Sequence, residues 1–196
     1  MKKYIIVLVL IFSFNKNFGQ VGVIIPIDRP DNYYQNLVNG TYIKDVNNTY
    51  SPYLGTWQAT VNGKVFTLYL EKATKLLHSY PNNDYFYQDV VIGKYTVTSL
   101  ATGEILKNTR LRTNPRMADF ICIGEPKNGK FEFQFTDRDL CDNSTSIILY
   151  GNPITNQLKF VNQKNDAYWL KKGCPYAQKH DIPYPFPAGP FDLTRQ

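Results

Sequence analysis

The sequence predicts an all-β protein, an antiparallel meander of eight or nine strands that closes into a barrel or a flattened barrel. Its 196 residues include 15 Tyr and 12 Phe, more aromatic side chains than a helical bundle requires. Twelve Gly and twelve Pro punctuate the chain in a way that suits strands and turns. Short alternating segments follow one another without an amphipathic helix between them, which argues against βαβ units. Closure is expected because it removes exposed strand edges.

Residues 1–19 have the pattern of a cleaved signal peptide. Lys2 and Lys3 precede the uncharged apolar run Tyr4–Phe14, and Gly19 offers a small residue for cleavage. The run is shorter than the roughly 20 apolar residues that span a bilayer, although a retained N-terminal anchor is the alternative. No Cys near the cleavage point is available for acylation. We therefore expect an exported chain, periplasmic or secreted, that does not span a membrane after cleavage.

The charge of the mature chain is mild. Removal of Lys2, Lys3 and Lys16 lowers the formal net charge from +6 to +3. The other Lys and Arg residues are scattered singly, apart from the pair Lys171 and Lys172. Because an exported protein rarely meets nucleic acid, the pI of about 9.1 does not predict a nucleic-acid partner. No pattern in the sequence predicts an oligomeric state.

Residues 20–53 form a Tyr-rich arm with no sustained period of 2 or 3.6 residues. The arm is predicted to be irregular and packed by its tyrosines, although a patch that grips a sugar or a peptide is the alternative. These tyrosines are Tyr33, Tyr34, Tyr42, Tyr50 and Tyr53.

Residues 54–172 are predicted to form the barrel, and its first hairpin carries the clearest signal. Asn62-Gly63 separates two alternating runs and predicts a two-residue turn. That turn sets Trp57 opposite Leu68, with one face of the hairpin directed into the core. The core face comprises Trp57, Ala59, Phe66, Leu68 and Leu70, and the residues assigned a structural role are Gly55, Trp57, Asn62 and Gly63.

Further strands follow at short intervals. They are expected at 88–98, 104–109, 117–123, 130–136, 145–150, 157–161 and 167–170. Gly93, in the middle of the first of these, suggests a bulge or a sharp bend of the kind that a closing sheet requires.

Residues 173–196 are predicted to be a Pro-rich tail, because Pro at this density disfavours a helix or a central strand. The favoured interpretation is that the aromatic side chains of the tail pack on the barrel. An exposed segment that recognises a partner is the alternative. The tail contains Pro183, Pro185, Pro187 and Pro190, with Tyr184, Phe186 and Phe191 among them.

Three cysteines remain after cleavage: Cys122, Cys141 and Cys174. In an oxidising compartment one pair can form a disulfide, and Cys122–Cys141 is favoured because the segment between them is predicted to run out and back as a hairpin. The alternative is that all three are small buried side chains.

No catalytic, cofactor or metal site is predicted. The two histidines, His78 and His180, stand in no metal-binding spacing, and a Cys174/His180 dyad lacks a positioned base. Residues 137–143 gather Asp137, Asp139, Asp142 and Asn143 in one loop, but they lack the glycine and the distal Glu of an EF-hand. We interpret the loop as a turn in which Asp side chains cap their own backbone, rather than as a calcium site.

Two segments carry a resemblance to known families. Tyr53–Trp57, leading into the hairpin, and Asp89–Tyr95 resemble a family of uncharacterised exported proteins of flavobacteria and relatives, a domain of unknown function, over residues 50–170. More distantly, Gly55-Thr56-Trp57 is similar to the Gly-x-Trp opening of lipocalin-like barrels, in which the Trp closes the barrel floor. The resemblance implies a barrel, but it implies no catalytic residues and no ligand identity.

Three functional hypotheses remain open. The first is a non-enzymatic binding module whose barrel lumen or mouth takes a small apolar or sugar-like ligand, such as a glycan. The second is a secreted hydrolase whose carboxylates the sequence does not identify. The third is a surface interaction protein that uses the Tyr-rich arm and the Pro-rich tail.

Overall fold

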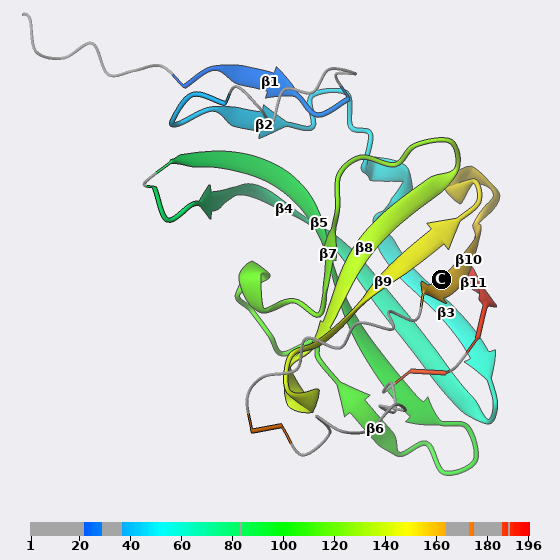
Figure 1. Cartoon of the computed structure of the whole chain (residues 1–196). Helices are drawn as coiled ribbons and strands as arrows, with labels where there is room; N and C mark the ends of the chain where they lie inside the picture. The colour runs from blue at the N-terminus through cyan, green and yellow to red at the C-terminus, as the bar shows by residue number, and fades with distance from the viewer. Residues whose placement is uncertain (1–21, 29–36, 83, 164–172, 175–185, 188) are drawn as a thin grey trace, which may run out of the picture.

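The computed structural model describes residues 22–28, 37–82, 84–163, 173–174, 186–187 and 189–196 (Figure 1). The predicted signal peptide, His180 and the strand expected at 167–170 lie outside these residues. The described part is all-β, with short 3₁₀ turns η3 (Ser51–Tyr53), η4 (Pro115–Met117), η5 (Arg138–Leu140) and η6 (Pro153–Thr155). Within it, no helix has the length and apolar character needed to cross a bilayer.

Eight antiparallel strands form a closed barrel, as predicted. Each strand of the ring pairs with the next one along the chain, and β11 returns to pair with β3. Three further strands, β1 (Ile24–Pro26), β2 (Tyr42–Lys44) and β6 (Ile105–Asn108), lie outside the ring. The strands of the ring are β3 (Gly55–Val61), β4 (Lys64–Ser79), β5 (Tyr85–Ser99), β7 (Phe120–Cys122), β8 (Lys130–Asp137), β9 (Asn143–Tyr150), β10 (Gln157–Gln163) and β11 (Phe191–Arg195).

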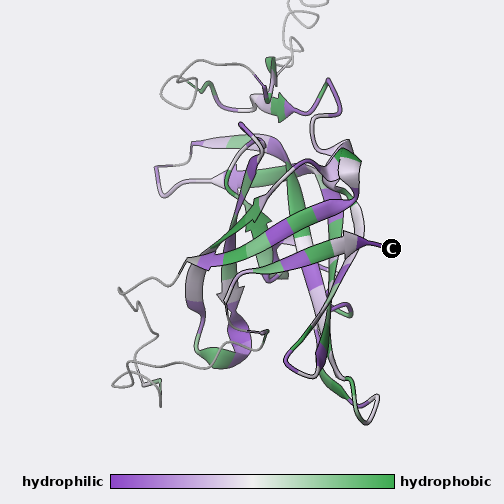
Figure 2. Cartoon of the chain, turned by 90° about the vertical axis from the view of Figure 1, so that its right-hand side faces the viewer, coloured by the Kyte–Doolittle hydropathy of each residue, from purple (hydrophilic) through white to green (hydrophobic). Residues whose placement is uncertain are grey.

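The β3–β4 hairpin has the predicted register, with Trp57 opposite Leu68. Both turn residues, Asn62 and Gly63, have positive φ (50° and 71°), as a type I′ turn requires. The predicted core face is buried throughout. Trp57 has no exposed surface, and its indole N–H donates to the carbonyl oxygen of Tyr53 at 2.8 Å. Figure 2 shows the resulting alternation of hydrophobic and hydrophilic bands along the barrel strands.

The ring closes where β7 meets β5 at only two positions, Ile92 opposite Ile121 and Gly93 opposite Phe120. A Cβ at Gly93 would lie 2.8 Å from Cβ of Phe120, so glycine is needed for close approach of the two strands. Of the two features that Gly93 suggested, a bulge or a sharp bend, the bulge is wrong, because Gly93 pairs in register with Leu70 and the β4–β5 register shifts instead between Ala73 and Leu76.

Aromatic rings fill the interior of the barrel. Phe186 comes from the predicted tail and is buried at the centre of this cluster. Its ring centroid lies between 4.8 and 6.2 Å from those of five core rings. Those rings belong to Phe66, Tyr95, Phe120, Phe135 and Phe160. The expectation that tail aromatics pack on the barrel is therefore confirmed for Phe186, although its ring lies inside.

The predicted boundary between barrel and tail is wrong at residues 191–195, because β11 is a strand of the ring. Phe191 and Leu193 point inward opposite Phe160 and Leu158 of β10. On its other edge β11 pairs with β3. This strand was not predicted from the sequence, because the prolines before it disfavour regular structure and its alternation begins only after Pro190.

The predicted disulfide is also wrong: Cys141 pairs with Cys174, and Cys122 is a buried free thiol. In the β7–β8 ladder Cys122 lies opposite Phe133, in the middle of β8. Cys141 follows η5, beyond the far end of β8. The hairpin therefore separates the two cysteines that it was expected to join.

We expect Trp57→Ala to lower the free energy of unfolding by about 3–5 kcal/mol, because it removes the largest fully buried side chain of the core face. Gln58→Ala, at the adjacent position on the opposite face, should cost less than about 1 kcal/mol. Urea unfolding of both variants measures the difference. Equal losses would mean that the β3 side chains are assigned to the wrong faces.

Candidate functional site

The long β4–β5 hairpin continues past the point of barrel closure and carries an accessory sheet on its outer end. There β2 pairs in parallel with β5, and β1 pairs in parallel with β2 (Figure 1). The prediction that the whole Tyr-rich arm is irregular is wrong, because β1 and β2 both lie within it. Parallel pairing between distant segments leaves no local pattern in the sequence.

Three tyrosines share one face of this accessory sheet, which we call the tyrosine face. Tyr42 of β2 and Leu77 of β4 both lie opposite Tyr87 of β5, and Tyr85 is two residues away along the same strand. The rings of Tyr85 and Tyr87 pack edge to face with centroids 6.0 Å apart. Of the tyrosines that the sequence analysis singled out, Tyr42 belongs to this face, whereas Tyr50 and Tyr53 are buried in the core.

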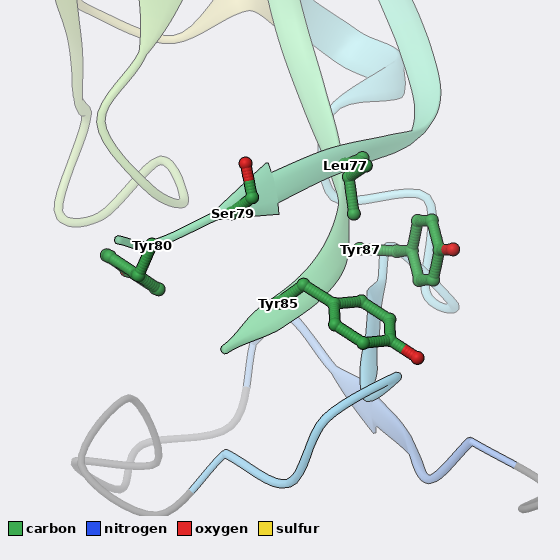
Figure 3. A pocket seen from close by; sticks show the side chains of 5 residues that line it. All are labelled: Leu77, Ser79, Tyr80, Tyr85 and Tyr87. Carbon is green, nitrogen blue, oxygen red and sulfur yellow. The ribbon is translucent and has the colours of Figure 1, made fainter. Parts of the chain in front are cut away.

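An open pocket of about 500 Å³ lies on this part of the hairpin (Figure 3). Its lining combines aromatic rings, an aliphatic side chain and hydroxyl groups. Tyr80, Tyr85 and Leu77 are 55%, 38% and 38% exposed, so substantial apolar surface faces solvent here. The lining residues are Leu77, Ser79, Tyr80, Tyr85 and Tyr87.

Two buried carboxylates, those of Asp89 and Asp45, hold the tyrosine face in place. Asp89 accepts the Tyr42 hydroxyl at 2.5 Å and the backbone N–H of Asp45 at 3.1 Å. Asp45 in turn accepts the backbone N–H of Thr49 at 2.7 Å and the ammonium group of Lys72 at 2.8 Å. Burial, followed by the hydrogen bond to Asp89, raises the pKa of Tyr42 to about 12. The phenol therefore stays protonated and acts as a fixed donor.

The carboxylate of Asp89 also stabilises the bulge in β4. Lys75 has a left-handed backbone (φ 55°), and its N–H donates to Asp89 at 3.0 Å. This conformation is costly for a residue with a Cβ, and the buried carboxylate offsets the cost. The bulge places the Lys75 ammonium group 5.1 Å from the ring centroid of Tyr87 and 6.0 Å from that of Tyr42.

A second group of carboxylates lies at the other end of β5. Asp119 pairs with Arg112, and Arg112 also reaches Asp139. Lys107 pairs with Asp139 and lies 3.6 Å from Asp137. Asp119 and Asp137 are buried, and each keeps one carboxylate oxygen without a hydrogen-bond partner. Asp139, by contrast, is 59% exposed, so only Asp119 and Asp137 of this cluster are shielded from solvent.

The loop considered for calcium has the predicted turn chemistry. Asp137 caps η5 by accepting the backbone N–H of Asp139 at 2.9 Å. Arg138 lies 3.8 Å from Asp142. The described residues contain no group of three or more His, Cys, Asp or Glu side chains arranged to hold a metal ion.

The histidine and cysteine candidates are held in structural contacts. His78 stacks on Phe86 with ring centroids 4.7 Å apart, and burial, with Arg116 nearby, lowers its pKa. Cys174 is in the disulfide, so its sulfur is not a free nucleophile for the dyad considered with His180.

We expect the contribution of Asp119 to the free energy of unfolding to fall as the pH rises, the opposite of the usual behaviour of a carboxylate in an ion pair. Burial raises the pKa of Asp119, so the folded chain holds this proton more tightly than the unfolded chain. The free energy of unfolding of the wild type relative to Asp119→Asn should therefore fall as the pH rises from about 4 through the raised pKa. Urea unfolding of both proteins across this range measures the difference.

Asp139→Asn is the matched control, for which we expect the opposite dependence of stability on pH. Lys107 lowers the pKa of Asp139, so the wild-type advantage over this variant should be lost as the pH falls below about 4. A wild-type advantage over Asp119→Asn that instead grew with pH above 4 would show that pairing with Arg112 outweighs burial.

Comparison with known proteins places this chain in a family. The model of a family of unknown function (DUF6705) matches residues 1–130, which include the accessory sheet and the ring as far as β7. No curated protein and no solved structure matches. Since the match covers about two thirds of the 196 residues, the chain belongs to this family of unknown function.

Proposed function

We propose that this protein is a binding module that holds a sugar-like ligand at the tyrosine face. The observation that carries the proposal is the open pocket, in which the rings of Tyr85 and Tyr87 pack on β5 and Leu77 and Ser79 of β4 lie beside them. A sugar ring has an apolar C–H face and a polar edge. Tyrosine offers the same combination, an apolar ring and a hydroxyl group that forms hydrogen bonds.

The hydrogen bonds that hold the face in place support this role. Tyr42, Asp89 and Asp45 form a satisfied hydrogen-bond network that holds β2 against β5. A platform held in place before the ligand arrives loses little conformational entropy on binding. Mixed apolar and polar lining is also typical of small-molecule sites.

The interior of the barrel favours an outer site over the lumen. Phe186 occupies the centre and contacts rings from β4, β5, β7, β8 and β10. A filled interior is one of the two states known for small barrels, the other being a cavity that holds one ligand. We propose a distant likeness to lipocalin-like barrels from Gly55-Thr56-Trp57 and the eight-stranded ring, with the ligand on the outside.

The hydrolase hypothesis gains no support from the buried carboxylates. Asp45 and Asp89 are engaged with Lys72 and with backbone N–H groups. Asp119 and Asp137 are buried in the carboxylate cluster on the barrel, where they lie near Arg112 and Lys107. Neither pair lines the open pocket, so we propose no reaction.

We further propose that the chain is exported after removal of residues 1–19. The positive start and the apolar run Tyr4–Phe14 support this, as does the Cys141–Cys174 disulfide. Disulfides form and persist mainly in oxidising compartments.

Binding to a glycan array should reveal at least one ligand, and Tyr85→Ala should weaken its binding by about tenfold or more, a loss of about 1.4 kcal/mol. Tyr150→Ala is the matched control, since Tyr150 is 39% exposed, close to Tyr85, but lines no part of this pocket. Titration calorimetry measures both. Unchanged binding in Tyr85→Ala, or an equal loss in the control, would remove the tyrosine face as the site.

Intact-mass analysis of the protein recovered from outside the cytoplasm tests the export proposal. The mature chain should begin at or near Gln20 and should be two hydrogens lighter than the fully reduced chain, because one disulfide has formed. Recovery of only the full-length, fully reduced chain from the cytoplasm would contradict it.

A further inference from the structure

We infer that the ligand of the tyrosine face is an acidic saccharide, one whose sugar rings carry carboxylate groups. The inference rests on the proposed function and specifies the chemistry of its ligand. It follows from the charges around the pocket.

Lys75 is a cation built into the edge of the site. The β4 bulge sets its backbone, and its ammonium group lies near the rings of Tyr42 and Tyr87. Tyr87 also lines the pocket, and Leu77, two residues along β4, lines it as well. A ligand packed on Tyr85 and Leu77 would therefore lie beside this ammonium group.

Among the described residues, no acidic side chain pairs with the ammonium group of Lys75. Its neighbour Lys72 pairs with Asp45 at 2.8 Å and lies 3.6 Å from Asp89, whereas Lys75 is in no ion pair with any residue that the structure describes. Its N–H bonds to Asp89, but its ammonium group contacts rings. One cation is thus held against aromatic rings and left available for an outside anion.

A second cation lies on the same side of the sheet. Lys44 is exposed and follows Tyr42 by two residues on β2, so the two side chains share a face. Among the described residues, Lys44 also has no acidic partner. Asp84 precedes β5, and its carboxylate accepts a hydrogen bond from the side-chain amide of Asn82.

The arrangement divides recognition between two groups of atoms. The apolar face of a sugar ring packs on tyrosine, and its acidic substituent pairs with Lys75. Because exposed ion pairs are screened by salt, the acidic part of the affinity should fall as ionic strength rises, whereas the stacking part should change little.

Two matched pairs of probes test the inference: hexamers of galacturonate and of mannuronate, each compared with its fully methyl-esterified form. Esterification keeps the sugar rings and removes the charge. At low salt we expect at least one hexamer to bind about tenfold or more tightly than its ester, as measured by titration calorimetry. Raising the salt to about 0.5 M should reduce that ratio.

Two variants assign the preference to Lys75. Lys75→Asn removes the charge and suits the left-handed backbone, because Asn tolerates this conformation better than most residues. It should lose the preference for acid over ester. Lys75→Arg keeps the charge and should retain it.

The outcomes separate the inference from the function on which it rests. Equal or tighter binding of both esters, an unchanged preference in Lys75→Asn, or no binding of any probe would overturn the inference. The proposed function would stand in each case if the glycan array showed ligands whose binding Tyr85→Ala weakens. An array without any such ligand would overturn both.

Discussion

The contact between Gly93 and Phe120 is the constraint on which the architecture depends. It is where β7 joins β5 and completes the ring, and the pairing extends over only two positions. Because the closure uses so little of β5, the rest of that edge is free. One part pairs with β6, and the other pairs with β2 and so supports the tyrosine face. A side chain at position 93 would push Phe120 away and open the ring at its narrowest seam.

Local patterns in the sequence predicted the barrel strands well. Asn62-Gly63 fixed one hairpin register, and the alternation of Phe131, Phe133 and Phe135 marked β8 and its inward face. Long-range pairing was beyond such patterns. The strand β11 is only five residues long and follows prolines, and the Cys141–Cys174 pair depends on how distant segments come together.

The candidate site was predictable only in part. The alternation Tyr85-Phe86-Tyr87 places two tyrosines on one face of a strand, and this signal was present in the sequence. Nothing local indicates that Tyr42 lies beside Tyr87, because that contact requires parallel pairing across about 45 residues. Nor does the sequence reveal the bulge that turns Lys75 toward the rings, since it depends on the buried carboxylate of Asp89.

The position of β11 between β3 and β10 sets an order of events during synthesis. Arg195 emerges from the ribosome 140 residues after Gly55, a delay of roughly 7 to 28 seconds at ordinary translation rates. Throughout that interval the sheet has two unpaired edges and no complete core, even though its first hairpin already exists.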